Sequence, residues 1–336
     1  MSKIKVISPG LCTTIQDNGR IGFQQFGIPV SGVMDKYSFL VANYLVGNEG
    51  HEAVLEIPYL GPTLEFDFDV TISITGADLS PKLNNNDIEM WKSINIKKGD
   101  ILSFKSIKSG SRSYIAFSAE IDVPEINNSK STLLKSKLGG FEGRQLKKGD
   151  IINFKNVRVL NKENILDKKY IPTFNNENTI RVLLGPQDDY FTENGIKTFL
   201  ESEYTITKNS DRMGMRLDGN TIEHKDKADI ISDATVFGSI QVPGDGKPII
   251  LLADRQTTGG YTKIATVIHI DLPKLAQMSP GNKINFEKIS LEEAQLEYKK
   301  FYDTLNAIKK SFLEKDSKHD CLFCAIFKKI SSLFKK

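Results

Sequence analysis

Short apolar runs separated by turn-forming residues recur along most of this chain. Between residues 53 and 154 they read VLEI, TLEFDF, VTISITG, ILSFK, SYIAFS and IINF. Further runs at residues 179–184, 249–253 and 264–270 continue the series in the second half. Many short runs with turn signals between them are typical of a β-sandwich or barrel, and not of alternating strands and helices. The pattern predicts a mainly β protein with a few helices.

An internal repeat points to two β modules. The segment KKGDILSF at residues 97–104 recurs as KKGDIINF at 147–154 and, more loosely, as SPGNKINF at 279–286. Each copy is predicted to form a tight turn that enters a strand. Because the third copy lies far into the second half, we expect a first module at residues 1–160 and a second at 179–290. The polar stretch between them, rich in Asn and Lys, is predicted to be a linker.

Helices are predicted at three places. Residues 36–46 carry apolar residues on one side, and Asp35 is placed to cap the start of this helix. Residues 191–199 are predicted to form a second helix. Ser290 and Glu293 have the spacing of a capping box, and apolar residues then recur at steps of three and four as far as Phe312. This spacing predicts an amphipathic helix that docks on the body or on a partner.

The C-terminal tail, residues 291–336, is therefore predicted to be helical and to be basic at its end, CLFCAIFKKISSLFKK. Such a helix fits a membrane surface, another protein, or an extension outside the functional body. His319, Cys321 and Cys324 supply only three possible zinc ligands, and the sequence has no second CxxC pair. No metal site is predicted there.

Composition excludes several classes of protein. The net charge of +3, without basic stretches interleaved with aromatic residues, argues against nucleic acid as a partner. No run approaches the roughly 18 apolar residues of a membrane span, and MSKIKVISPG at the start lacks the apolar core of a signal peptide. Three cysteines do not make a disulfide framework, which favours a cytoplasmic location. The sequence also lacks Walker, dinucleotide-binding, G-x-S-x-G and HExxH motifs.

The most informative stretch is residues 238–271, where two apolar runs flank the polar segment DRQTTGGY. We expect this segment to be an exposed loop on a rigid frame, with its glycines at positive φ so that a ligand lies close to the backbone. The alternative is an ordinary hairpin with a Gly-Gly turn and a structural Asp–Arg pair. The catalytic candidates are Asp254, Arg255, Gln256, Thr257 and Thr258, and the binding candidates are Gly259, Gly260 and Tyr261.

A second group of polar residues lies on turns elsewhere. It comprises Gln16, Asp17, Arg20, Ser31, Gly32, Asp35 and Arg212. Helix capping is the simpler account of Asp35, and ion pairs with Asp211 or Asp218 are the simpler account of Arg212. Acid, guanidinium, amide and hydroxyl groups of this kind suit a ligand with an amide, ureido or carboxylate group. Since no clear nucleophile or metal site accompanies them, we expect a subunit that shares its site with another chain.

Several long motifs in order carry a family resemblance over about residues 4–295. They are TTIQDNGRIGFQQFGIPVSGVMD, ANYLVGN, SDRMGMRLDG and IQVPGDGKPIILLADRQTTGGY. Together they resemble the biotin-dependent carboxyltransferase family, which includes allophanate hydrolase subunit 2, the KipI antagonist KipA and the C subunit of bacterial 5-oxoprolinase. The resemblance implies two tandem cyclophilin-like β-barrel modules plus the helical tail. It also adds Gln241, in the last motif, to the binding candidates.

The resemblance further implies an activity and partners. We expect an enzyme subunit of the 5-oxoprolinase kind, inactive alone, that opens 5-oxoproline to glutamate with ATP together with the A and B subunits of that enzyme. ATP would be used by the complex, and no biotin would be attached to this chain, which has no A-M-K-M-like segment. The alternatives are a KipA-type regulatory protein that binds a KipI-like partner, and a carboxyltransferase subunit of urea or allophanate metabolism.

Overall fold

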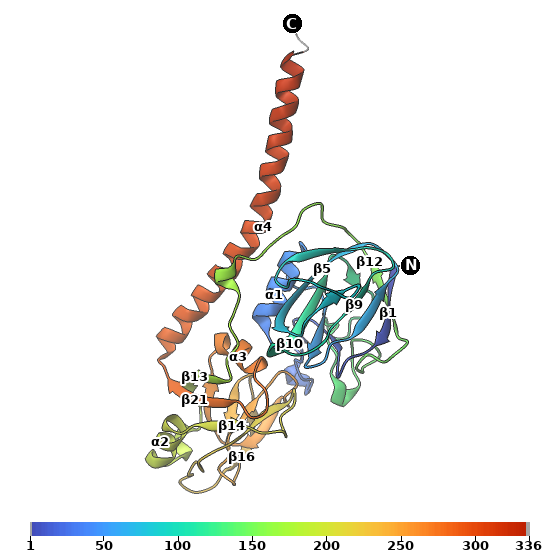
Figure 1. Cartoon of the computed structure of the whole chain (residues 1–336). Coiled ribbons are helices and arrows are strands. Elements are labelled where there is room, and N and C mark those ends of the chain that lie inside the picture. Colours follow the sequence, from blue (N-terminus) through green and yellow to red (C-terminus); the bar gives the residue numbers. More distant parts are fainter. Residues whose placement is uncertain (1, 334–336) are drawn as a thin grey trace.

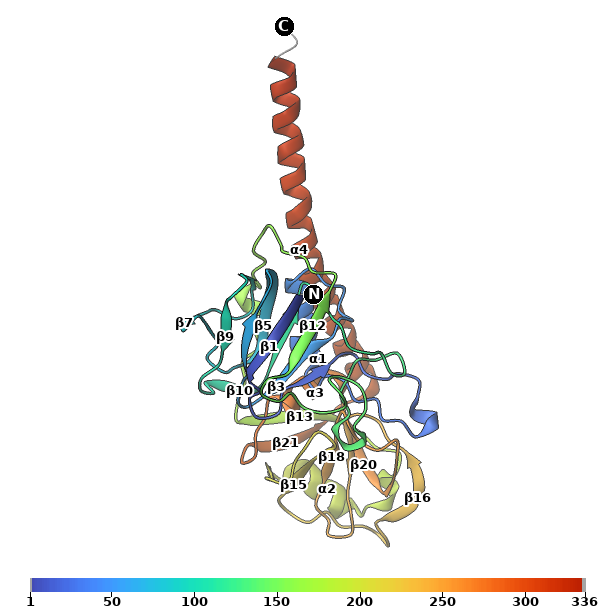
Figure 2. The same cartoon turned by 90° about the vertical axis from the view of Figure 1, so that its right-hand side faces the viewer.

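The computed structural model describes the backbone of residues 2–333 and the side chains of residues 2–313. Figures 1 and 2 show two β-rich halves that follow one another along the chain, with helix α4 (Leu291–Leu333) running beside both. The described chain has four α-helices and is otherwise mainly β. The predicted fold class is confirmed at this level.

The first half consists of two sheets. Side chains from both sheets, such as Ile4, Leu64, Ile72 and Ile115, pack in one buried core. One sheet has the order β11 (Glu120–Ile121), β12 (Ile151–Lys155), β1 (Ser2–Ser8), β4 (Thr63–Phe66), β9 (Ile101–Ser103), β6 (Lys82–Leu83) and β7 (Asn86–Asp87). The other has the order β2 (Thr14–Gln16), β3 (Val54–Pro58), β10 (Ser109–Phe117), β5 (Val70–Asp78) and β8 (Ser93–Ile96).

The second half contains a closed seven-stranded barrel. Its order is β13 (Glu177–Leu184), β20 (Lys263–Val267), β17 (Ser239–Gln241), β18 (Ile249–Leu251), β15 (Gly214–Asp218), β14 (Tyr204–Ile206) and β21 (Lys283–Lys288). All neighbours are antiparallel except β13 and β21, which close the barrel in parallel. A separate two-stranded ribbon, β16 (Asp229–Ala234) with β19 (Thr258–Tyr261), stands beside it.

The three copies of the repeat form the same turn. Gly99, Gly149 and Gly281 have φ values of 93°, 90° and 91°, which favour glycine because they lie in the left-handed region. In each copy the residue after the glycine bonds back across the turn: the side chains of Asp100, Asp150 and Asn282 accept from the backbone N–H three residues earlier, at 2.7–2.8 Å. The turns lead into β9, β12 and β21, as the sequence predicts.

Helix α1 (Lys36–Leu45) covers the first half, and its capping is as predicted. The backbone N–H of Ser38 donates to Asp35 Oδ1 at 2.9 Å. The shorter helices α2 (Glu193–Glu201) and α3 (Leu272–Ala276) belong to the second half. Five 3-10 turns complete the helical elements: η1 (Gln24–Phe26), η2 (Leu134–Ser136), η3 (Lys168–Tyr170), η4 (Asp188–Tyr190) and η5 (His269–Asp271).

The stretch between the halves is polar in composition but is packed against the first half. The amide of Asn164 donates to the carbonyl of Leu45 at 3.0 Å, and Leu166 is buried in the cluster under α1. The stretch is therefore held in place by the body and is not a free linker. The module boundaries at residues 160 and 179 remain a prediction.

Helix α4 joins the two halves. Its capping box forms as predicted: Ser290 N–H donates to Glu293 Oε2 at 2.8 Å, and Glu293 N–H donates to Ser290 Oγ at 3.2 Å. Arg181 of β13 pairs with Glu297 near the start of α4. Further along, the buried face of α4 packs under α1; the residues that bury it are Leu305, Ile308 and Phe312. His319, Cys321 and Cys324 lie outside the residues whose side chains are described.

Over the described residues, no helix combines the length and the apolar character needed to cross a membrane.

The packing of α4 leads to a prediction about stability. Leu305 is 1% exposed whereas Leu313 is 56% exposed on the same helix. We expect Leu305→Ala to lower the free energy of unfolding by about 2–5 kcal/mol, because it opens a cavity under α1. Leu313→Ala, the matched control, should change it by less than about 0.5 kcal/mol. Chemical denaturation measures both.

A chain that ends at residue 314 is a second control, because it keeps the three buried residues of α4, which are Leu305, Ile308 and Phe312. It should unfold at the same denaturant concentration as the full chain. Equal stability of the two leucine variants, or insoluble protein after the truncation, would contradict this assignment of the docking face.

Candidate functional site

A charged cleft of about 560 Å3 lies where the two halves meet. The first half contributes Glu56 from β3 and Arg112 from β10, and the second half contributes Arg212 and Asp254 from loops at the mouth of the barrel. The remaining lining residues are Leu11, Cys12, Thr14, Pro58, Tyr59, Leu134, Lys135, Ser210, Asp211 and Met213.

Arg212 is the centre of this cleft. Its Nε and Nη2 donate to the two oxygens of Asp254 at 2.9 and 3.0 Å, and its Nη1 pairs with Glu56. Burial alone would lower the pKa of Arg212, but the carboxylates of Asp254 and Glu56 outweigh this and raise it above its ordinary value. One guanidinium thus binds a carboxylate of each half. The expected pairs of Arg212 with Asp211 or Asp218 are not formed.

Local structure explains how Arg212 reaches both carboxylates. Asp211 Oδ1 accepts from the N–H groups of Met213 and Gly214 at 2.7 and 3.1 Å, which makes a tight turn ahead of β15. The N–H of Asp254 donates to the carbonyl of Arg212 at 2.9 Å, so the two side chains start from adjacent backbone. Glu56 is held from the other side, where its Oε2 accepts from Tyr114 Oη at 2.9 Å.

The two predicted groups of residues meet in space. Ser31 has φ 56°, its N–H donates to the carbonyl of Ala253 at 3.1 Å, and its hydroxyl lies 2.7 Å from Asp254 Oδ1. Gly32 has φ 87°, and its carbonyl accepts from Arg212 Nη2 at 2.5 Å. A Cβ at Gly32 would approach Gly19 N to 2.9 Å, so this position requires glycine. Ser31, Gly32, Arg212 and Asp254 therefore form one site.

The prediction of an exposed Arg255 is wrong. Arg255 is 5% exposed, and its Nη1 reaches only the carbonyl of Leu252 at 3.4 Å. It does not pair with Asp254, and no carboxylate among the described residues neutralises it. Burial lowers the pKa of Arg255 to about 10. Arg20 is also fully buried, and its Nη2 donates to the carbonyl of Ser131; burial lowers its pKa, although the charges of Asp17 and Asp254 act in the opposite direction. Both cations lie in the protein without a matching ion pair.

Apart from Asp254, the residues of the DRQTTGGY segment do not line the cleft. Thr258 to Tyr261 form strand β19, which pairs with β16, and Gln256 is exposed just ahead of it. Gly259 and Gly260 are in this strand without positive φ, so the expected positive φ and the alternative of a Gly-Gly turn are both wrong. A Cβ at Gly259 would lie 2.3 Å from Gln241 Nε2, so a larger residue there would require the side chain of Gln241 to move. Thr257 is linked through its backbone to Thr235.

The remaining candidates support other loops. Gln16 donates to the carbonyl of Thr132 at 3.0 Å, and Asp17 accepts from Ser129 Oγ and Lys130 N–H, both at 2.6 Å. These bonds fix the segment before η2, which contributes to the cleft wall. Asp35 lines a different cavity, described below.

Glu56, Arg112 and Cys12 were missed as candidates. The sequence does contain an indication for Glu56, because VLEIP places an acid in the middle of an apolar strand, and a buried carboxylate needs a partner. The sequence contains no such indication for Arg112 and Cys12, because their place in the cleft follows from long-range packing. Burial raises the pKa of the Cys12 thiol. Within the described side chains, no three His, Cys, Asp or Glu residues gather as metal ligands.

The arrangement suits recognition of a polar, planar group. Arg212 donates to both oxygens of Asp254 and so orients this carboxylate, which accepts N–H donors from a ligand in the cleft. Arg112 and Lys135 add positive charge on the walls, where an anionic group of the ligand would be stabilised. The geometry thus provides an N–H acceptor and a cationic rim.

The fold and the site define a carboxyltransferase domain. Residues 26–288 match the family described as carboxyltransferase domain, subdomain A and B. The structure superposes on the crystal structure of the Kluyveromyces lactis urea amidolyase with a TM-score of 0.86 and 31% identity, covering 91% of this chain. The match covers 20% of that protein, so the chain spans about one fifth of its length.

The chain belongs to this carboxyltransferase family, which confirms the resemblance inferred from the motifs. It is 39% identical to the C subunit of 5-oxoprolinase from Haemophilus influenzae over 281 residues, which cover 84% of this chain and 89% of that protein. It is 38% identical to the C subunit of 5-oxoprolinase from Escherichia coli over 291 residues, covering 87% of this chain and 93% of that protein.

The Arg212 network predicts a large effect on stability. Arg212→Ala leaves two carboxylates, each less than a tenth exposed, without their cation, and should lower the free energy of unfolding by about 3–5 kcal/mol. Arg216→Ala removes an exposed arginine of β15 and is the matched control, expected to change stability by less than about 0.5 kcal/mol. Adding Glu56→Gln to Arg212→Ala should restore part of the loss in denaturation experiments. A neutral Arg212→Ala would show that the network is not structural.

Proposed function

We propose that this chain is the C subunit of an ATP-dependent 5-oxoprolinase and acts with the A and B subunits to open 5-oxoproline to L-glutamate. The observation that carries this proposal is the 38–39% identity, over nearly all of both chains, to two proteins named as the C subunit of 5-oxoprolinase. In this proposal the complex uses ATP, and this chain carries no attached biotin.

The chemistry of the substrate fits the cleft. 5-Oxoproline carries a ring N–H, a ring carbonyl and a carboxylate, and hydrolysis breaks the bond between the ring nitrogen and the carbonyl carbon. Asp254, oriented by Arg212, is placed to accept the ring N–H. Arg112 and Lys135 on the walls suit the substrate carboxylate. Arg255, next to Asp254 in the chain, is not among the residues that line the cleft, but it is a buried cation without a carboxylate partner among the described residues.

The repeated turn supports a further part of the proposal, that the halves are tandem cyclophilin-like modules. The same glycine conformation precedes a strand twice in the first half and once in the second. Two sheets in one half and a closed barrel in the other would then be divergent forms of one ancestral unit.

Reconstitution tests the function. The chain is co-expressed with the A and B subunits from the same genome, and glutamate release from 5-oxoproline is followed with and without ATP. ATP-dependent release that requires all three chains supports the proposal. A stable complex without release would favour the KipA-type regulatory function. The likeness to urea amidolyase favours a second candidate, and carboxylation of urea in the presence of a biotin carboxylase and a biotin carrier would establish it.

Because Arg255 has no carboxylate partner among the described residues, we expect its substitution to affect turnover and stability differently. Arg255→Met replaces a buried cation that lacks a carboxylate with an apolar chain of similar length. The isolated chain should therefore be no less stable, since the variant removes the cost of burying the charge. Turnover of the reconstituted complex should fall by about 10²-fold or more, the effect of losing one preorganised donor. Full turnover would remove Arg255 from the site.

An exposed apolar patch marks a face for the partner protein. The patch consists of Ile21, Phe26, Ile231 and Val236, whose exposed fractions are 73%, 69%, 95% and 51%. Gln24 Nε2 lies 3.3 Å from the carbonyl of Thr235, which places the loop with η1 beside the ribbon with β16. Figure 2 shows this loop, in blue, next to β16. Large apolar side chains grouped in this way are typical of interfaces.

We expect the chain to form a stable hetero-oligomer with the B subunit, a KipI-like protein, through this patch. Phe26→Asp and Ile231→Asp should each weaken the association by at least about 10-fold, because a charge would be desolvated in the interface. Ile107→Asp, at an exposed apolar residue of the β9–β10 loop, is the matched control and should have no effect. Size-exclusion chromatography and calorimetry of the purified pair measure the strength of this association. Undiminished binding by both patch variants would place the interface elsewhere.

A further inference from the structure

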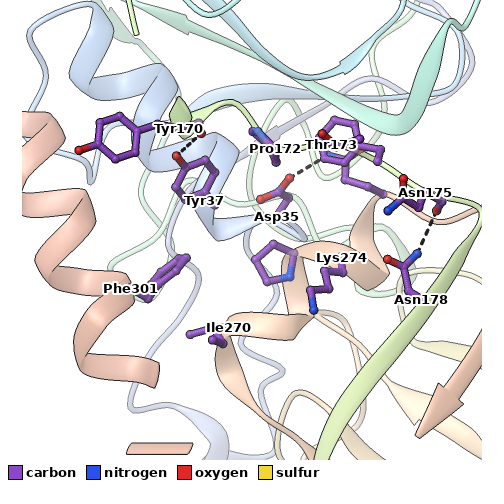
Figure 3. Close-up of a pocket in the computed structure, with 13 residues that line it drawn as sticks. Asp35, Tyr37, Tyr170, Pro172, Thr173, Asn175, Asn178, Ile270, Lys274 and Phe301 are labelled. Carbon is purple, nitrogen blue, oxygen red and sulfur yellow. Dashed lines mark hydrogen bonds between the residues drawn. The ribbon is translucent and has the colours of Figure 1, made fainter. Parts of the chain in front are cut away.

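A second cavity, of about 220 Å3, lies at the junction of four segments. They are the start of α1, residues 170–178, α3 with the preceding η5, and the first turns of α4. Figure 3 shows the side chains that line it. The volume is below the roughly 300–1,000 Å3 of drug-sized ligand sites, so only a small molecule fits.

Aromatic rings form much of the wall. Tyr37 and Phe301 lie with their ring centroids 5.9 Å apart at 53°, and Tyr170 and Phe174 complete the aromatic lining. The hydroxyl of Tyr37 donates to the carbonyl of Tyr170 at 2.5 Å, which Figure 3 marks with a dashed line. Because this hydroxyl is already used, Tyr37 offers the cavity its ring. The faces of such rings carry partial negative charge.

A carboxylate without a counter-charge lies at the same cavity. Asp35 is 1% exposed and accepts only from neutral donors, namely the N–H and hydroxyl of Ser38 and the amide of Gln277, at 2.6–2.9 Å. No Lys, Arg or His among the described side chains stabilises its charge, and the nearby Glu56 is of like sign. Burial raises the pKa of Asp35. A carboxylate in such surroundings favours a cation beside it.

Helix capping does not explain the charge. Asn and Ser cap a helix about as well as Asp, so the role of Asp35 at the start of α1 needs its oxygen and not its ionisation. The one cation among the described side chains of the cavity lining, Lys274, is already paired with Asp271 at 2.9 Å. Oδ1 of Asp35 accepts the N–H of Ser38 and keeps a lone pair for another donor.

We propose that this cavity binds a small organic cation, an alkylammonium group, with the Asp35 carboxylate as its counter-charge and the rings of Tyr37 and Phe301 against its alkyl groups. Aromatic faces attract such cations, and the attraction grows where water is excluded. This site is distinct from the cleft at Arg212 and goes beyond the proposed function. Its ligand is defined by charge and size, as a cation of a few carbon atoms.

The site is connected to the cleft by hydrogen bonds. The N–H of Asp35 donates to Tyr114 Oη at 2.9 Å, and Tyr114 Oη donates to Glu56, which pairs with Arg212. Gln277, bonded to Asp35, also accepts from the N–H of Arg112 at 3.0 Å. A cation beside Asp35 would therefore act on groups that position the cleft.

Choline serves as the probe, and its uncharged isostere 3,3-dimethylbutan-1-ol serves as the matched control. Calorimetric titration of the full, isolated chain should show binding of choline and at least about 10-fold weaker binding of the alcohol, since only choline is attracted by the carboxylate. Asp35→Asn keeps the helix cap and removes the charge, and should weaken choline binding by at least about 30-fold. Phe301→Leu should weaken it by about 2- to 30-fold.

Three outcomes would overturn the proposal: no choline binding, equal affinity for choline and the alcohol, or undiminished choline binding by Asp35→Asn. Leu313→Ala, on the same helix as Phe301 but exposed, should bind choline like the unchanged chain. If Asp35→Asn unfolds, the comparison of choline with the alcohol and the Phe301→Leu variant decide the question. The titrations contain this chain alone, without the other two proteins of the complex, so their result is independent of the 5-oxoprolinase proposal.

Discussion

The guanidinium of Arg212 binds a carboxylate from each half of the molecule, and much of the structure is arranged around that contact. Glu56 comes from the middle of a strand in the first half, and Asp254 follows a barrel strand in the second. Arg212 and Asp254 both belong to the second half, so Glu56 gains its counter-charge only when the two halves are docked. Docking of the halves and formation of the cleft are therefore one event.

The same contact explains the local backbone around the cleft. Ser31 and Gly32 adopt left-handed conformations so that a hydroxyl reaches Asp254 and a carbonyl reaches Arg212. Glycine adopts such a conformation readily, but at Ser31 it costs free energy in isolation and persists where the surroundings hold it. Here the surroundings are two polar side chains from the other half, so the strained loop and the ion network stabilise each other.

The sequence predicted the regular parts of this protein well. The tight turns at Gly99 and Gly149, the cap at Asp35 and the capping box at Ser290 all follow from local chemistry, which short segments carry in full. Ser31, Arg212 and Asp254 were also identified, but Glu56, the second carboxylate bound by Arg212, was not. The pairing of Arg212 with Glu56 joins residues 156 positions apart, and no local pattern records it. Arg255 was judged exposed because the polarity of a segment does not reveal how deeply the fold buries it.

Helix α4 contacts β13 of the barrel and α1 of the first half, and the chain also connects the halves through residues 155–178. The junction at the cleft is therefore a contact between two bodies that are tethered twice. If the polar contact opens, the tethers keep its partners at a high effective concentration, so that closure is an intramolecular step. The closed arrangement of the cleft is thereby favoured by the connectivity of the chain as well as by the contact of Arg212 with Glu56.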